Sequence, residues 1–130
     1  MIIKLLSTSN YCIYNKSIGK RLSPIAAIIL SVLCDKMEYF RKTDGLTKKN
    51  QLVMIEMDFD GVMKEVPCFY FTRPKMEEET GISEYQQNTA EKLLIQKGII
   101  KKRDCGMPKR NYYYIDEQAL ETFLREETEV

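Results

Sequence analysis

Residues 72–98 carry two successive helix-start signals, and each is followed by a glycine that can end a helix. Thr72 is a good N-cap, because its hydroxyl accepts a hydrogen bond from one of the amides that the first turn leaves unpaired. Pro74 is tolerated in that turn, where the amide that proline lacks would have no partner. We therefore expect a short helix from about residue 73 to residue 80, ended by Gly81.

A second helix is predicted directly after the first. Ser83 is its N-cap, apolar residues recur at helical spacing over residues 84–97, and Gly98 supplies the stop. Two short helices joined by a turn of about three residues are typical of a helix-turn-helix. We expect this unit over about residues 72–97.

The segment after the second helix predicts two short strands joined by a turn-rich tip at 104–108. They form a ribbon, or wing, over about residues 99–115. If the strands pair across Gly106, five cations of the ribbon lie close together: Lys101, Lys102, Arg103, Lys109 and Arg110. Such a group repels itself and is stabilised by phosphates, whereas a solvated surface hairpin is the alternative interpretation. Tyr113 is expected to face the opposite side from Tyr112 and Tyr114, with at least one of these sets in the core.

The remaining segments predict the scaffold around this unit. Ser23-Pro24 begins an apolar helix that runs to about residue 40 and is closed by Asp44-Gly45. Residues 51–71 alternate as a β-hairpin around Asp60-Gly61, with Pro67 indicating an edge or a bulge. Asp116 caps a last helix, and an acidic tail follows at 125–130. We therefore expect one domain over residues 1–130, of the α+β class: a winged helix-turn-helix with a β-hairpin insertion and a C-terminal helix.

Composition excludes several classes of function. Among 130 residues there is no histidine, which removes the most common general base and zinc ligand. The four cysteines are widely spaced and are expected to be small, reduced core residues, and the three consecutive glutamates at 77–79 point apart on a helix. We expect no enzyme activity, no metal, no cofactor and no small-molecule substrate. No apolar run is long enough for a membrane span, and a cytoplasmic protein is expected.

The net charge of +1 conceals an uneven distribution. Residues 83–115 carry seven basic and three acidic groups, or +4, whereas residues 116–130 carry one basic and six acidic groups, or −5. A basic region that includes the second helix and the ribbon is therefore followed by an acidic end. This pattern favours a local contact with a polyanion over a uniformly basic coat.

The second helix offers the side chains that a DNA-reading helix needs. Its exposed side and first turns are expected to carry the DNA contacts: Ser83, Tyr85, Gln86, Asn88, Thr89 and Lys92. Asparagine and glutamine can pair with adenine edges, whereas hydroxyl groups suit phosphate oxygens. The alternative is that these residues form an ordinary solvated helix face.

The sequence from Phe69 to Ile115 resembles the N-terminal winged helix of phage-type replisome organisers and of related plasmid and mobile-element replication initiators. The resemblance rests on Thr-Arg-Pro-Lys-Met-Glu-Glu-Glu-Thr-Gly-Ile-Ser-Glu-Tyr-Gln-Gln-Asn-Thr-Ala and on Lys-Gly-Ile-Ile-Lys-Lys-Arg, and it extends over residues 23–116. It implies binding to double-stranded DNA in replication initiation or its control. It also implies that Tyr85, Gln86 and Asn88 lie in the recognition helix and that residues 101–103 lie near phosphates.

Two other functions remain open at this point. One is a transcriptional regulator of the winged-helix type. The other is a winged helix that serves as a protein–protein assembly module, with the 51–71 hairpin or the last helix as the contact surface. Beyond duplex DNA, the partners to consider are therefore replication proteins and a second copy of this chain.

Overall fold

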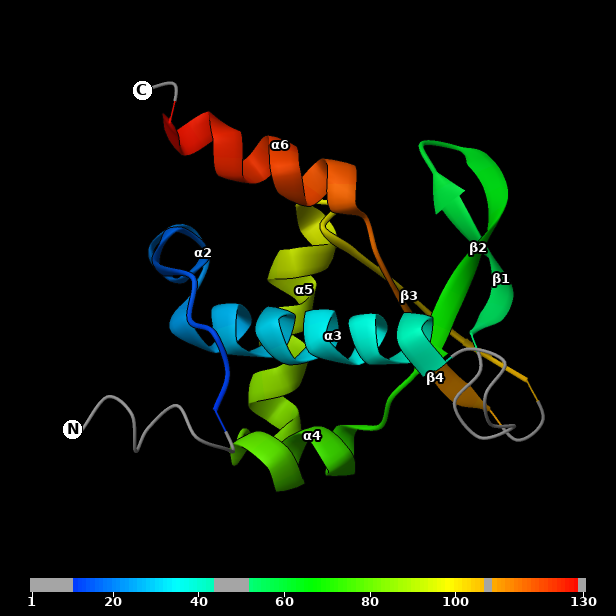
Figure 1. The fold of residues 1–130 in the computed structure, drawn as a ribbon, viewed down its shortest axis with the longest axis horizontal. Helices are drawn as coiled ribbons and strands as arrows, with labels where there is room; N and C mark the ends of the chain where they lie inside the picture. The colour runs from blue at the N-terminus through cyan, green and yellow to red at the C-terminus, as the bar shows by residue number, and fades with distance from the viewer. Residues whose placement is uncertain (1–10, 44–51, 107–108, 129–130) are drawn as a thin grey trace.

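The computed structural model describes residues 11–43, 52–106 and 109–128, and it has the expected mixture of helices and antiparallel strands (Figure 1). The elements follow in the order α2 (Lys16–Arg21), α3 (Pro24–Thr43), β1 (Val53–Phe59), β2 (Val62–Tyr70), α4 (Arg73–Thr80), α5 (Glu84–Gln96), β3 (Ile100–Cys105), β4 (Arg110–Ile115) and α6 (Glu117–Thr128). The α+β class predicted from the sequence is therefore confirmed.

Helix α3 is the central helix, and α5 crosses behind it in Figure 1. The hydroxyl of Ser23 accepts a hydrogen bond from the amide of Ala26 at 2.9 Å, which confirms the predicted start. Seven residues of α3 are buried, because its apolar residues cover a wide arc. The predicted stop at Asp44-Gly45 lies outside the described residues. Helix α2 was not predicted; the side chain of Asn15 caps its six residues.

Helices α4 and α5 begin and end almost where the sequence predicts. Thr72 caps α4 through the amide of Lys75, and Gly81 ends it with a φ of 77°, a conformation that favours glycine. Ser83 caps α5, and residues 81–83 form the connection between the two helices. The last residue of α5 is Gln96, one residue earlier than expected, because Lys97 is its C-cap.

The strands form one antiparallel sheet in the order β1-β2-β4-β3. The β1–β2 hairpin is confirmed, with Asp60 and Gly61 both at positive φ in its turn. Strand β2 pairs with β4 only at Phe69 and Tyr70. Pro67 lies just before this short stretch, where β2 has β1 as its neighbour and its missing amide costs no bond to β4.

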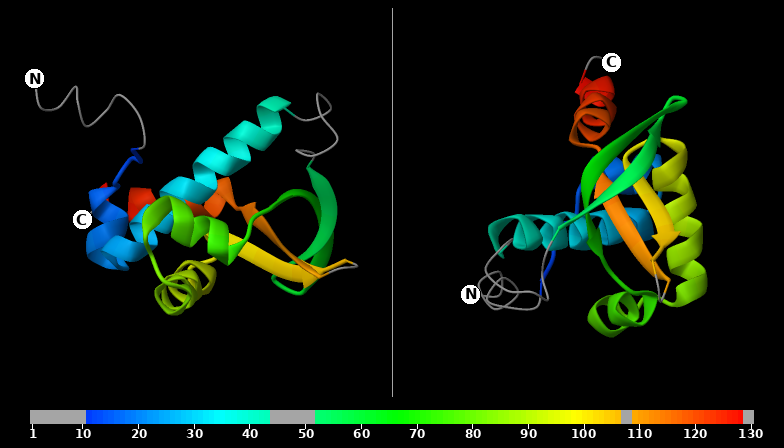
Figure 2. Two further views of the ribbon diagram at one scale, coloured as in Figure 1. Left: turned by 90° about the horizontal axis from the view of Figure 1, so that it is seen from below. Right: turned by 90° about the vertical axis from the view of Figure 1, so that its right-hand side faces the viewer.

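The sheet is strongly curled, so that its two edge strands approach each other (Figure 2). Arg103 on β3 donates a hydrogen bond to the backbone oxygen of Glu56 on β1 at 2.8 Å. The ring of Phe59 lies 5.9 Å from that of Tyr114, and Nζ of Lys101 lies 4.6 Å from the Phe59 ring centre. These contacts hold the hairpin over the outer face of the β3–β4 ribbon.

The core lies between α3, α5 and the inner face of β2 and β4. Phe69 is completely buried and stacks between Phe40 and Tyr113, with ring centres 5.9 Å apart on both sides. As predicted from the alternation, Tyr113 faces this core, while its two tyrosine neighbours face the other side. Phe40 lies on α3, Phe69 on β2 and Tyr113 on β4, so the stacked rings hold these three elements together.

Two cysteines, Cys34 and Cys68, are reduced and at least partly buried, as the sequence predicts. Cys68 is fully buried and Cys34 half-buried, and neither forms a disulfide. Burial raises the pKa of both thiols from 9.0 to about 11, so they are protonated at neutral pH. A protonated thiol in this position packs like a small apolar side chain.

Helix α6 packs its apolar side against the rest of the protein. The side chain of Asp116 accepts a hydrogen bond from the amide of Ala119 at 3.0 Å, which confirms the predicted cap. Phe123 is buried, and the guanidinium of Arg21 lies 3.6 Å from its ring centre. None of the helices in the described ranges has both the length and the hydropathy that a bilayer crossing requires.

Candidate nucleic-acid interface

Helix α5 turns a mostly polar surface away from the protein, with Ile95, which is 43% exposed, near its end. Tyr85 is 81% exposed, and the first two turns of the helix also expose Glu84 and three of the predicted contact residues, Gln86, Asn88 and Thr89. Lys92 continues this surface one turn further along. Because the opposite side of α5 packs on α3, the exposed side points away from α3 (Figure 2).

The buried side of α5 contains two polar residues that the sequence analysis did not place there. Gln87 is 3% exposed, and its amide group donates to the backbone oxygens of Arg73 and Ile82, both at 3.0 Å. It thereby holds the start of α4 and the connection after α4 against α5. Glu91 is 4% exposed and lies one turn further along the same side.

Glu91 is the centre of a buried polar network, which consists of Glu91, Arg73, Lys102 and Tyr113. Its carboxylate lies 2.6 Å from a guanidinium nitrogen of Arg73 and 3.5 Å from Nζ of Lys102, and it accepts a hydrogen bond from the Tyr113 hydroxyl. Burial and the charge of Glu91 raise the pKa of Tyr113, so its phenol remains a donor. The network joins α4, α5, β3 and β4, and so fixes how α5 sits beside the ribbon.

Four of the predicted contact residues form hydrogen bonds within the protein. Ser83 and Gln86 form a capping box: the Gln86 amide donates to the Ser83 hydroxyl at 3.3 Å, and the Gln86 side-chain oxygen accepts from the Ser83 amide at 3.1 Å. Asn88 accepts a hydrogen bond from Arg73 at 3.4 Å, and the Thr89 hydroxyl donates to the Tyr85 backbone oxygen. Among the predicted contact residues of α5, Tyr85 and Lys92 are therefore the ones whose side chains form no such bonds within the described residues.

The five cations lie on one paired ribbon, as expected, but they do not share one face of it. Alternation along β3 directs Lys102 toward α5 and Glu91, where its side chain is only 18% exposed. Lys101 and Arg103 face the other side of the sheet, toward the hairpin. Lys109 and Arg110 lie exposed beyond the turn, close to the tip.

Lys109 and Arg110 are consequently the ribbon cations that remain available to a ligand. Neither forms an ion pair within the described residues, and the guanidinium of Arg110 lies 5.0 Å from the ring centre of Tyr70. Figure 2 shows the ribbon extending from the body on the side where α5 lies. The exposed side of α5 and the ribbon tip thus form the two parts of the candidate interface.

Sequence reasoning missed Gln87, Glu91 and Arg73. The buried side of α5 consists of Gln87, Ala90, Glu91 and Leu94, so two polar residues share it with two apolar ones. Gln87, Glu91 and Leu94 share the i, i+4, i+7 spacing of one helix face, which was the available signal. Their polar character concealed it.

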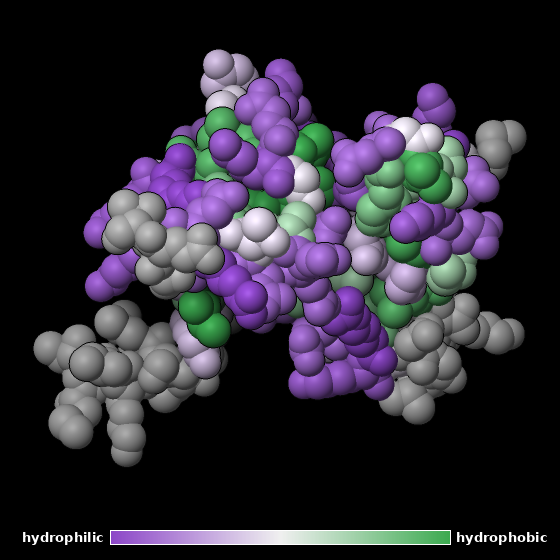
Figure 3. All heavy atoms as spheres, turned by 90° about the horizontal axis from the view of Figure 1, so that it is seen from above, coloured by the Kyte–Doolittle hydropathy of each residue, from purple (hydrophilic) through white to green (hydrophobic). Residues whose placement is uncertain are grey.

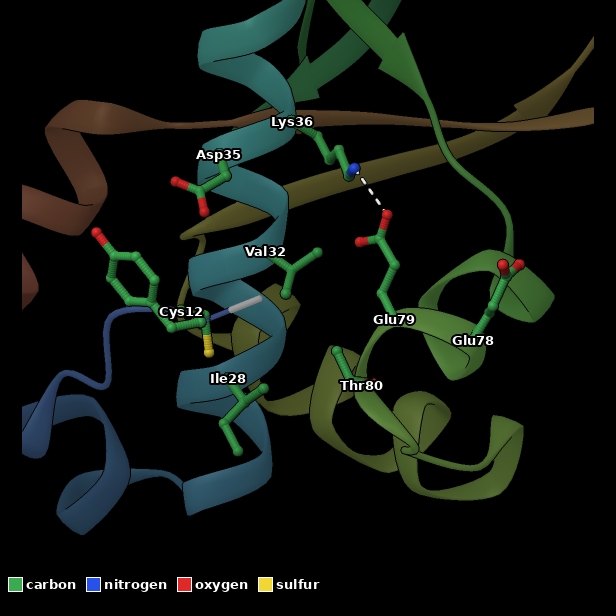
Figure 4. A pocket seen from close by; sticks show the side chains of 9 residues that line it. Cys12, Ile28, Val32, Asp35, Lys36, Glu78, Glu79 and Thr80 are labelled. Carbon is green, nitrogen blue, oxygen red and sulfur yellow. Dashed lines mark hydrogen bonds and ion pairs between the residues drawn. The ribbon is translucent and has the colours of Figure 1, made fainter. Parts of the chain in front are cut away.

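A cleft of about 680 Å³ lies elsewhere, between α3, α4 and the segment before α2 (Figure 4). Its wall carries the carboxylates of Asp35, Glu78 and Glu79, and Nζ of Lys36 forms an ion pair with Glu79 at 2.8 Å. Glu77, Glu78 and Glu79 are all exposed, as expected for a solvated helix face. The described residues contain no group of ligands that could hold a metal ion.

Comparison with known proteins finds no matching family model, no matching curated protein and no matching solved structure.

Proposed function

We propose that this chain binds double-stranded DNA as a winged helix-turn-helix protein, with α5 as the recognition helix and the β3–β4 ribbon as the wing. The observation that carries the proposal is the exposed polar surface of α5, with Tyr85 at 81% exposure and Lys92 beside it. The order of α4, α5 and the ribbon agrees with a fold that places its second helix in the major groove.

The electrostatics of this surface support the same proposal. Lys92 on α5 and Lys109 and Arg110 near the ribbon tip are exposed and form no ion pair within the described residues. Three such cations in reach of one duplex would release counterions from three phosphates. Lys102 does not belong to this set, because its ammonium group neutralises the buried carboxylate of Glu91.

Within DNA binding, we favour a role in replication initiation or its control in a phage, plasmid or other mobile element. This preference rests on the sequence resemblance described above, and regulation of transcription is the alternative. A cytoplasmic location accompanies either role. The two roles differ in the DNA that is bound, so selection of preferred duplexes from a random pool separates them.

The proposal is tested by titrating a labelled mixed-sequence duplex with the protein and following fluorescence anisotropy. We expect binding that weakens roughly 30- to 60-fold between about 50 mM and about 200 mM salt, the slope for roughly three phosphate contacts. Lys109→Ala should lower the magnitude of the slope of the log binding constant against the log salt concentration by about one. Lys102→Ala should leave this slope unchanged. The proposal would be contradicted if the protein did not bind the duplex at low salt, or if the binding constant did not change with salt concentration.

An assembly module is the second candidate function, and the surface of the hairpin favours it. Met54 and Met63 are 55% and 52% exposed on β1 and β2, and Figure 3 shows hydrophobic side chains among polar ones over this part of the protein. Phe59 does not belong to this surface, because it packs against Tyr114. This alternative requires self-association that persists at high salt and is lost in a Met54→Ser, Met63→Ser variant.

A further inference from the structure

Two tyrosines form a partly exposed aromatic pair where β2 meets β4. Tyr70 and Tyr112 lie opposite each other in the register, with ring centres 6.3 Å apart and ring planes inclined at 52°. Tyr70 is 38% exposed, which is unusual for an aromatic ring in a central strand, and Tyr112 is half-buried. The guanidinium of Arg110 lies over the Tyr70 ring at 5.0 Å.

The same tyrosine also borders an aromatic hollow of about 310 Å³. The hollow lies between α3 and the chain that leads from β2 into α4, and its wall is formed by Lys36, Tyr39, Phe40, Tyr70, Phe71, Thr72 and Lys75. Tyr39 on α3 is 51% exposed. Aromatic faces therefore continue from α3, through Tyr70, to the Tyr112 ring on β4.

The charges beside this aromatic surface are not equivalent. Lys36 forms an ion pair with Glu79 at 2.8 Å, and Lys75 lies 3.9 Å from Glu78. Lys109 and Arg110, by contrast, form no ion pair within the described residues and are exposed. An anionic ligand would therefore find its free positive charge at the β4 end of the surface, next to Tyr70 and Tyr112.

We propose that Tyr70 and Tyr112 form a stacking platform for unpaired bases of a single-stranded nucleic acid, whose backbone lies along Lys109 and Arg110. Exposed aromatic rings beside free cations are the features that bind single strands, because every base has a stacking face and every nucleotide carries a phosphate. Arg110 over a tyrosine ring also offers a planar group against which a base can stack.

This platform is distinct from the exposed side of α5. The hollow is bordered by α3, whereas α5 packs on α3 and turns its polar side away from it. The platform's aromatic residues are thus separate from the proposed duplex contacts Tyr85 and Lys92. The inference consequently stands whether or not α5 binds a duplex.

The test is a titration of labelled oligothymidylate of about 12 nucleotides, followed by fluorescence anisotropy at low salt, with an oligouridylate and a duplex in parallel. We expect the single strand to bind, Tyr70→Ala to weaken it about tenfold, and Tyr70→Phe, which keeps the ring, to stay within about twofold of the wild type. Tyr85→Ala, the matched control on α5, should leave single-strand binding unchanged. The oligouridylate arm shows whether the site distinguishes RNA from DNA.

Arg110→Glu provides a second variant, because Arg110 is exposed and its replacement does not disturb the core. We expect it to weaken single-strand binding about tenfold as well. If the wild type does not bind the single strand, or if Tyr70→Ala and Arg110→Glu both bind it normally, the proposal is overturned. Arg110 belongs to both proposed surfaces, whereas Tyr70 belongs to the platform alone. Duplex binding that depends on Tyr85 should therefore survive Tyr70→Ala, so this variant makes the two proposals fail separately.

Discussion

Replacing Glu91 with alanine is expected to lower the free energy of unfolding by about 3–5 kcal/mol, because it removes one partner of a buried ion pair. Arg73 and Lys102, each with a side chain only 18% exposed, would lose their neutralising carboxylate. Tyr113 would lose the acceptor of its hydroxyl in the same change. Urea unfolding measured by circular dichroism gives this difference directly.

Two further variants make the Glu91 prediction specific. Glu77→Ala removes an exposed carboxylate from α4 and should change stability by less than about 0.5 kcal/mol. Glu91→Gln keeps a hydrogen-bond acceptor for Tyr113 but loses the charge, so its loss should be smaller than that of Glu91→Ala. If Glu91→Ala were no more destabilising than Glu77→Ala, the network would not hold α5 to the ribbon.

A Lys92→Glu, Lys109→Glu variant is expected to bind duplex DNA about 100-fold more weakly than the wild type, because each change replaces a phosphate contact with repulsion. One lysine lies on α5 and the other beside the ribbon tip, so the pair tests both parts of the proposed interface. Both side chains are exposed, and the fold should be unaffected. Anisotropy titration with the labelled duplex measures the change.

The matched control is Lys16→Glu, Lys20→Glu, which changes the net charge by the same amount. Both of these lysines are exposed on α2, away from α5 and the ribbon. We expect this variant to lose no more than about threefold in duplex affinity, through the long-range field alone. Equal losses in the two variants would mean that net charge, and not this surface, determines binding.

Local signals in the sequence were sufficient to predict most of the elements. The caps at Ser23, Thr72, Ser83 and Asp116 each involve a side chain and an amide three residues apart, so their chemistry can be read without tertiary information. The Asp60-Gly61 turn is similar, because positive φ at both positions restricts the residues that can occupy it. Such features depend on a few neighbouring residues.

The buried network and the curl of the sheet depend on contacts between distant residues. Glu91 meets Lys102 and Tyr113 only after α5 has packed beside the ribbon, and Arg103 reaches Glu56 only after the hairpin has folded over it. A charged residue in a sequence is usually exposed, so the sequence predicted Lys102 as a DNA contact. The structure assigns that ammonium group to Glu91.

The most direct test of the proposed interface is a titration of isotope-labelled protein with a short duplex, followed by the backbone amide signals in nuclear magnetic resonance. We predict that the first and largest shifts occur in residues 83–92 of the capped helix and at Lys109 and Arg110, with α2 and α6 little changed. Shifts confined to the β1–β2 hairpin or to α6, with the amides of residues 83–92 unmoved, would contradict the assignment of α5 as the DNA-reading helix.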